Sequence, residues 1–176
     1  NYHDMFQNAM DFSGALLDLG VQRGDRIGLI ADNREEWEQA DVGLLSIGAI
    51  DTPRGCDATE SDLSYILSFS EVHICSTENE AQIKKLLNIK KNVPTLDTII
   101  PFDPVSDEIK AQCKEQGIDC FQFRDLQEKG HAWRKEHPDV VEQELDKGKI
   151  DDLATIIFTS GTTGKSKGVM LTQNNL

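Results

Sequence analysis

The sequence predicts an α/β fold with an open, mainly parallel sheet that is flanked by helices on both faces. Short apolar segments, typical of buried strands, alternate with longer segments in which apolar residues recur every three or four positions. Glycine, proline or a helix-capping residue separates the two kinds of segment. Strands that alternate with helices pair in parallel through right-handed crossovers, which places helices on both sides of the sheet.

An amphipathic helix is predicted at the start of the chain. Its apolar positions step alternately by four and three residues and are Met5, Ala9, Phe12, Leu16 and Leu19. Gly20 suits the left-handed turn that often ends a helix. Residues 26–31 are then predicted to form a short buried strand.

The second helix is expected to begin at a capping box made by Asn33 and Glu36, which are three residues apart. The strand that follows, at residues 49–52, is expected to stop at Pro53. Proline has no N–H to donate to a neighbouring strand, which makes it a common strand boundary.

Three further helix–strand units are predicted between residues 59 and 123. The expected helix caps are Thr59 with Asp62, Thr77 with Glu80, and Ser106. The predicted helices span residues 59–68, 77–89 and 106–116, and the predicted strands span residues 72–76, 98–102 and 118–123. Two polar helices at residues 123–137 and 139–147, divided by Pro138, complete this part of the chain.

A strand at residues 153–159 leads into a loop of glycines, hydroxyl side chains and lysines, T-S-G-T-T-G-K-S-K-G, from Thr159 to Gly168. Glycines let the backbone approach an anion closely, and backbone N–H and hydroxyl groups donate to phosphate oxygens. Ligands of parallel α/β sheets bind at the carboxyl ends of the strands. The loop is therefore expected to bind a polyphosphate at that edge of the sheet.

Two other classes of protein, P-loop NTPases and serine hydrolases, are disfavoured by the residues of the loop. The nucleotide-binding P-loop, G-x-x-x-x-G-K-[ST], needs a glycine where this chain has Thr159. A P-loop also opens into a helix, whereas residues 169–171 form an apolar run that predicts a strand, followed by Thr172 as a helix cap. A serine hydrolase is disfavoured because no G-x-S-x-G frame surrounds Ser160.

The loop resembles the phosphate-loop signature of the adenylate-forming, or AMP-binding, enzymes. This superfamily contains acyl-CoA synthetases, adenylation domains and luciferases, and its signature is T-S-G-T-T-G-x-P-K-G-V followed by x-L-T-H-x-N. Residues 159–164 match without a gap, and most of residues 167–172 match as well. Ser166 replaces the usual proline. Gln173 replaces the histidine of many members, so no role of that histidine is carried over.

A second segment points to one branch of the superfamily. D-T-P-R-G-C-D at residues 51–57 resembles V-P-R-G-T-D of bacterial long-chain fatty acyl-CoA synthetases. Matches to G-V-x-x-G-D-R-V at residues 20–27 and N-R-x-E-W at residues 33–37 extend the resemblance. It implies that residues 1–176 are a fragment, the N-terminal part of an AMP-binding domain, with the remainder of the large domain and the C-terminal domain absent.

The resemblance implies ATP-dependent activation of a long-chain fatty acid to acyl-adenylate and then acyl-CoA, with ATP, Mg²⁺ and coenzyme A taking part. It assigns phosphate binding to Thr159, Ser160, Gly161, Thr162, Thr163, Gly164 and Lys167. It places no catalytic residue and no metal ligand in this chain, because the corresponding motifs lie downstream in the family. The fragment alone is therefore expected to be inactive. Arg54 is expected to belong to a structural turn near the substrate side.

Two rival functions stay open: an adenylation domain for an amino or aryl acid, and a non-catalytic nucleotide-sensing domain. The net charge of −13, from 31 acidic and 18 basic residues, disfavours nucleic acid as a partner. Four cysteines without a C-x-x-C pair disfavour a zinc site and fit free thiols in the cytoplasm. No apolar run approaches the ~20 residues that cross a bilayer, so any membrane contact is expected to be peripheral, at the inner face.

Overall fold

The computed structural model describes residues 1–159 and 166–176, and these residues form a seven-stranded sheet in the order β5-β4-β3-β1-β2-β6-β7. Neighbouring strands are parallel except for the antiparallel pair β6 and β7. The strands are β1 (Arg26–Ile30), β2 (Ile50–Arg54), β3 (Ile74–Thr77), β4 (Thr98–Pro101), β5 (Asp119–Cys120), β6 (Leu153–Thr159) and β7 (Lys167–Thr172). The predicted open, mainly parallel sheet is confirmed.

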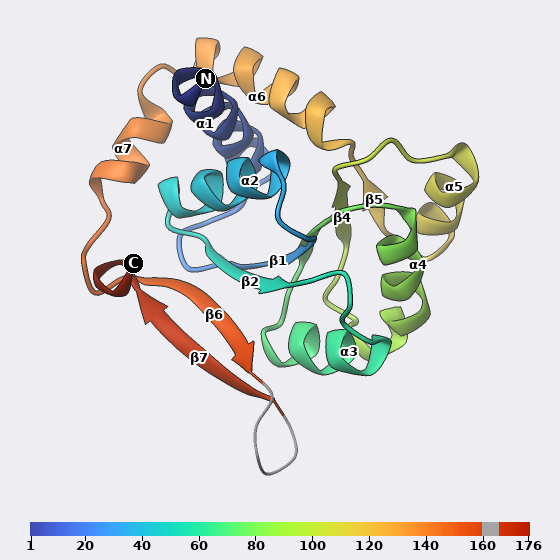
Figure 1. The fold of residues 1–176 in the computed structure, drawn as a ribbon. Helices are drawn as coiled ribbons and strands as arrows, with labels where there is room; N and C mark the ends of the chain where they lie inside the picture. The colour runs from blue at the N-terminus through green and yellow to red at the C-terminus, as the bar shows by residue number, and fades with distance from the viewer. Residues whose placement is uncertain (160–165) are drawn as a thin grey trace.

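Helices cover both faces of the sheet (Figure 1). The α-helices are α1 (Tyr2–Asp18), α2 (Glu35–Ser46), α3 (Glu60–Phe69), α4 (Glu80–Ile89), α5 (Asp107–Glu115), α6 (Phe123–Glu136) and α7 (Val140–Asp146), and short 3₁₀ helices span Lys90–Asn92 and Gln173–Asn175. One hydrophobic core joins β1 to α1, α2, α6 and α7, and a second core joins the sheet to α3, α4 and α5. In β1, Leu29 packs into the first core and Ile30 into the second, as expected of a strand buried on both faces.

Helices α1 and α6 approach each other closely on the first face. Gly130 of α6 lies so near α1 that a Cβ atom at this position would be 1.7 Å from the carbonyl oxygen of Asp11. The buried carboxylate of Asp11 pairs with Arg134 at 2.8 Å and with His131 at 3.2 Å, and both partners belong to α6. Glycine permits the short distance between the helices, and the ion pairs fix their relative position.

The predicted helix starts are confirmed at some positions and wrong at others. Thr59 and Asp62 form the predicted capping box of α3, and Ser106 caps α5. The capping box predicted at Asn33 is wrong, because Glu36 pairs instead with Arg34 and Arg124 and the N-cap of α2 makes no side-chain hydrogen bond.

The predicted cap at Thr77 is also wrong. Thr77 is the last residue of β3, and Asn79 caps α4 by accepting hydrogen bonds from the backbone of Ala81 and Gln82. Pro53 does not end β2 but lies within it, opposite Leu29 of β1. On its other side β2 pairs with β6 only at Asp51, so the missing N–H of Pro53 removes no bond there.

Strand β5 is shorter than the predicted segment 118–123, because Phe123 already begins α6. Gln122 precedes that helix and donates hydrogen bonds to the carbonyls of Pro101, Phe102 and Asp103 at 3.0 to 3.1 Å. The strand predicted at residues 169–171 is confirmed as β7, and Thr172 caps the short helix after it. Across the described ranges, no helix has the length and apolar character needed to cross a membrane.

A buried carboxyl group lies in the middle of the sheet. Asp51 of β2 is 2% exposed, and its Oδ1 has no hydrogen-bond partner among residues 1–159 and 166–176. Burial, followed by the charge of Asp41 in α2, raises the pKa of Asp51 to about 7. Burial also raises the pKa of Asp41, to about 6, with a smaller contribution from Glu38.

Replacing Asp51 with asparagine is expected to flatten the pH dependence of stability. The pKa of Asp51 is raised on folding, so between about pH 4 and pH 7 the folded chain keeps a proton that the unfolded chain has lost. The wild-type stability therefore falls as pH rises through this window, by on the order of a few kcal/mol. Urea denaturation from pH 4 to pH 8 measures the difference. The exposed Asp119→Asn control should follow the wild type, and parallel curves for Asp51→Asn and the wild type would contradict the expectation.

Candidate functional site

The carboxyl ends of β1, β2, β3 and β6 meet at one edge of the sheet, because these strands are parallel. A cavity of about 640 Å³ opens there, and it is lined by Ala31, Asp32, Asn33, Trp37, Pro53, Arg54, Gly55, Ile157 and Phe158. The predicted loop leaves the sheet at this edge, because β6 ends at Thr159. The structure thus places the start of the loop where parallel α/β sheets bind ligands.

The structure brings together the first and the last of the predicted phosphate-binding residues. Thr159 and Lys167 lie opposite each other in the antiparallel β6–β7 pair, and both are exposed. The sequence predicted strands on both sides of the loop but did not predict that they pair. The other predicted residues lie outside the described residues, and they are Ser160, Gly161, Thr162, Thr163 and Gly164.

The base of the loop is attached to helix α3 through Phe158. Its ring packs edge-on against Tyr65 and Phe69 of α3, with centroid distances of 6.2 and 6.1 Å. Gly168 lies opposite Phe158 in β7, and a Cβ atom at Gly168 would be 3.3 Å from the Phe158 ring. The aromatic contacts therefore hold the end of β6 against α3, and glycine leaves room for the ring.

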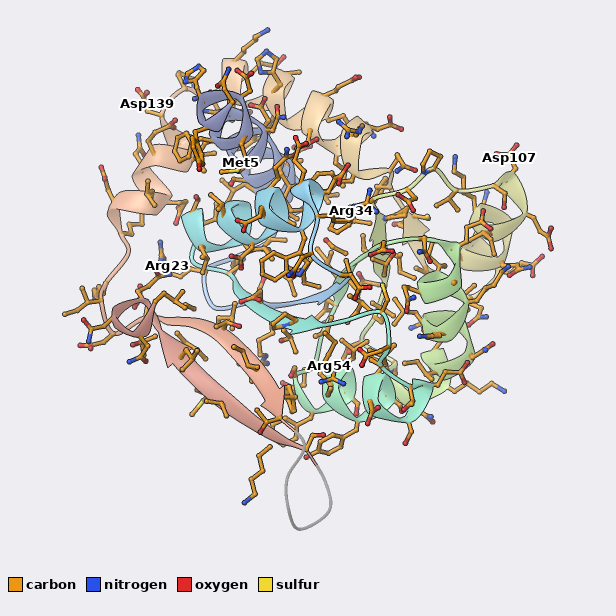
Figure 2. The ribbon with its side chains drawn as sticks, viewed as in Figure 1. Met5, Arg23, Arg34, Arg54, Asp107 and Asp139 are labelled. Carbon is orange, nitrogen blue, oxygen red and sulfur yellow. The ribbon has the colours of Figure 1, made fainter. Side chains whose placement is uncertain are left out.

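Arg54 is a site residue whose contact the sequence did not reveal. It is the last residue of β2, and its Nη1 donates a hydrogen bond of 3.4 Å to the carbonyl oxygen of Phe158. Figure 2 shows Arg54 at the end of β2, on the side of α3 and the end of β6. The P-R-G segment drew attention to this arginine, but a contact with a residue 104 positions later leaves no signal in a single sequence.

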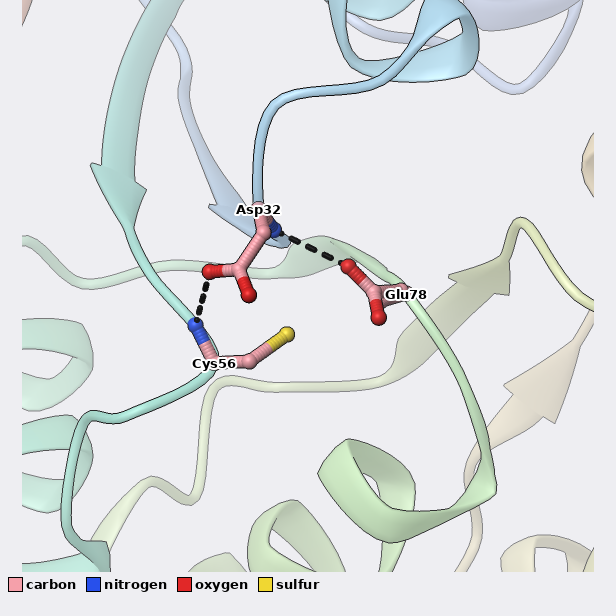
Figure 3. Close-up of side chains that lie close together, drawn as sticks. All are labelled: Asp32, Cys56 and Glu78. Carbon is pink, nitrogen blue, oxygen red and sulfur yellow. Dashed lines mark hydrogen bonds between the residues drawn. The ribbon is translucent and has the colours of Figure 1, made fainter.

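Three potential metal ligands also gather at this edge (Figure 3). They are Asp32, Cys56 and Glu78, which follow β1, β2 and β3, and their ligand atoms lie within 4.8 Å of one another. Asp32 accepts a hydrogen bond from the backbone N–H of Cys56 at 3.0 Å, and Glu78 accepts one from the backbone N–H of Asp32 at 3.0 Å. Sequence spacing did not reveal this group because its members come from three separate loops.

The hydrogen bonds of this group hold three loops together. Burial, followed by a hydrogen bond to Glu78, raises the pKa of Cys56 to about 11. The thiol is therefore protonated at neutral pH in the metal-free chain, and a metal ion would have to displace that proton. Lys85 of α4 reinforces the same loop by donating to the carbonyls of Cys56 and Ala58 at 2.8 and 2.9 Å. These contacts fix the backbone beside the cavity.

Comparison with protein families and with individual relatives gives a consistent result. The AMP-binding enzyme family matches residues 1–176. Fatty acyl-CoA synthetase A of Dictyostelium discoideum is 27% identical over an alignment of 177 residues, which covers 100% of this chain and 25% of the relative. The long-chain-fatty-acid–CoA ligase ACSBG2 of Rattus norvegicus is 29% identical over 178 residues, which are 99% of this chain and 24% of the relative. The chain therefore spans about a quarter of the length of these relatives.

Solved structures share the fold. The A-PCP didomain of carboxylic acid reductase from Segniliparus rugosus, in complex with AMP, superposes with a TM-score of 0.83 at 18% identity, over 99% of this chain and 26% of that chain. The anthranilate CoA ligase AuaEII, in complex with anthranoyl-AMP, gives a TM-score of 0.79 at 22% identity, over 98% of this chain and 29% of that chain. The sheet and its flanking helices thus match the N-terminal part of adenylation domains.

Proposed function

Because the chain belongs to the AMP-binding enzyme family, we propose that the protein containing it activates a long-chain fatty acid at the expense of ATP. The fatty acid carboxylate attacks the α-phosphate of ATP, which gives acyl-adenylate and releases pyrophosphate. The thiol of coenzyme A then attacks the acyl carbon, which gives acyl-CoA and releases AMP. This chain contributes the loop that holds the phosphates during the first step.

The observation that carries the proposal is the position of the two residues that flank the loop. Its two ends, Thr159 and Lys167, are paired at the carboxyl edge of the sheet, beside the cavity that Arg54 lines. Both reactants of the first step are anions, so the protein has to place them and offset the charge that moves onto pyrophosphate. A loop of N–H and hydroxyl donors with Lys167 at its base suits that task.

The roles of individual residues follow from this chemistry. We assign contacts with the β- and γ-phosphates to residues 159–164, and electrostatic stabilisation of the leaving pyrophosphate to Lys167. Mg²⁺ enters with ATP as the MgATP substrate and offsets further negative charge. The thiol that takes the acyl group comes from coenzyme A, so no nucleophile is required of this chain.

The choice of a long-chain fatty acid rests on two observations. The D-T-P-R-G-C-D segment at residues 51–57 resembles that of long-chain fatty acyl-CoA synthetases. The relatives at 27% and 29% identity are a fatty acyl-CoA synthetase and a long-chain-fatty-acid–CoA ligase. The likeness to an anthranilate ligase, at 22% identity, supports the fold and not the substrate.

ATP–pyrophosphate exchange by the whole protein tests the proposal, with palmitate, acetate, benzoate and mixed amino acids compared. We expect exchange with palmitate and little with the other acids. Exchange with benzoate or amino acids instead would keep adenylation and replace the substrate. A folded protein that binds MgATP but exchanges with none of these acids would favour a nucleotide-sensing domain over an enzyme.

A further inference from the structure

Arg54 is the last residue of β2, the strand that lies between β1 and β6 in the sheet. The parallel register pairs Ile30 of β1 with Arg54, and Asp51 of β2 with Thr155 of β6. Arg54 lies three residues after Asp51, and Phe158 lies three residues after Thr155, so the two are neighbours on adjacent strands. Since Phe158 directly precedes Thr159, Arg54 lies next to the residue from which the loop departs.

Arg54 is half-buried, and its guanidinium makes a single hydrogen bond within the described residues. Its Nη1 donates to the carbonyl oxygen of Phe158 at 3.4 Å. Its Nε is buried and has no hydrogen-bond partner in the described part of the chain, and no ion pair involving Arg54 occurs there. The charge of Arg54 acts only weakly on Asp62, whose pKa is lowered mainly by hydrogen bonds from Thr59.

Burying part of a guanidinium without an ion-pair partner is costly, so stability alone does not account for an arginine at this position. The backbone alone does not fix the end of β6 on this side, because β2 and β6 pair only at Asp51 and Thr155. Between that pair and the loop, β2 is linked to the β6 backbone by the Arg54 hydrogen bond to Phe158. The arginine therefore extends the attachment of β6 up to the start of the loop.

We propose that Arg54 is a positioning residue for phosphate binding, acting through the carbonyl of Phe158 to fix where the loop leaves the sheet. The inference rests on the proposed function, because it takes the loop to be the site of the ATP phosphates. Arg54 acts before ligand arrives, by holding the end of β6. Its loss should weaken MgATP binding and leave binding of the acid unchanged.

The test uses the whole protein with Arg54→Met, which keeps most of the side-chain volume and removes the donors, and Arg54→Lys, which keeps a charged donor. Arg26→Met is the matched control. Arg26 begins β1 at the opposite end of the sheet, where it pairs with Glu71 at 2.9 Å. The measurements are the Kd for MgATP by calorimetry, the KM values for MgATP and palmitate in pyrophosphate exchange, the Tm, and hydrogen–deuterium exchange of residues 156–159 without ligand.

For Arg54→Met we expect the Kd and KM for MgATP to rise about tenfold, with the KM for palmitate unchanged. Backbone exchange of residues 156–159 should become faster in the ligand-free protein, while the Tm shifts by only a few degrees. Arg54→Lys should recover most of the MgATP affinity. Arg26→Met should match the wild type in every one of these ligand measurements.

Three results for the Arg54→Met variant would overturn the inference. MgATP affinity of Arg54→Met within twofold of the wild type removes the role altogether. Weaker MgATP binding with unchanged hydrogen–deuterium exchange of residues 156–159 would mean that Arg54 contacts the ligand directly. A lower Tm with KM changed for palmitate as much as for MgATP would mean a general structural role. If the wild type binds MgATP without exchanging pyrophosphate, only the proposed function is contradicted, because the Kd still tests the role of Arg54. If the wild type does not bind MgATP, both the proposed function and the role of Arg54 are contradicted.

Discussion

Lys167→Ala is expected to lower palmitate-dependent pyrophosphate exchange by the whole protein about a hundredfold, the usual scale for removing one preorganised group that stabilises transition-state charge. Lys167 stands opposite Thr159 at the base of the loop, is exposed, and forms no ion pair with any residue in the described ranges. Its charge is therefore available to the phosphates. Because Lys167 is exposed, the Tm should stay within a few degrees of the wild type.

A control within the same loop separates this role from a general effect of positive charge. Lys165 occupies a position that the signature leaves variable, so Lys165→Ala should reduce exchange by no more than a few fold. Equal losses in the two variants would mean that the loop acts only through its net charge. Unchanged exchange in Lys167→Ala would contradict the assignment of this lysine to the phosphate site.

Gly130→Ala is expected to destabilise the chain by about 3 kcal/mol, at the upper end of the range for overpacking a tight contact. The added Cβ would lie 1.7 Å from the carbonyl oxygen of Asp11 and 2.7 Å from the backbone nitrogen of Ala15. Both atoms belong to the backbone of α1 and cannot move aside separately. Helix α6 must therefore shift, which weakens the contact of His131 and the ion pair of Arg134 with Asp11.

Alanine stabilises an isolated helix by about 1 kcal/mol relative to glycine. A loss of stability in Gly130→Ala would therefore point to the contact with α1. Gly14→Ala is the matched control: its Cβ would meet Arg134 Cγ at 2.8 Å, a side-chain atom that can move, and the Gly130 carbonyl oxygen at 3.0 Å. Chemical denaturation should show a clearly smaller loss for Gly14→Ala. A Gly130→Ala chain as stable as the wild type would contradict the close helix contact.

The sequence predicted those features of the fold that depend on neighbouring residues. The capping box of Thr59 and Asp62 was found because its partners are three positions apart and no distant group competes for them. The similar pair at Asn33 and Glu36 failed because Glu36 pairs with Arg34 and with Arg124, which lies 88 residues later. The sequence predicts a strand end at Pro53, because it cannot show that β6 does not pair with β2 at this position.

The same distinction between local and distant residues holds for the candidate site. The glycine loop and its flanking strands were predicted from contiguous residues, whereas the pairing of Thr159 with Lys167 came from the structure. The contact of Arg54 with Phe158 and the group of Asp32, Cys56 and Glu78 depend on which strands are neighbours in the sheet. Strand order is set by the packing of the whole domain and leaves no local pattern.

The β6–β7 hairpin has a practical consequence for work with this segment by itself. Strand β7 is the last in the sheet order, and Met170, Val169 and Ile157 are 68%, 43% and 39% exposed. An edge strand with apolar side chains offers its unpaired backbone groups as a template for a second copy. Protein concentration, more than temperature, would then determine whether the purified segment stays monomeric. Met170→Lys would place a charge on this edge strand and is expected to keep the segment in solution.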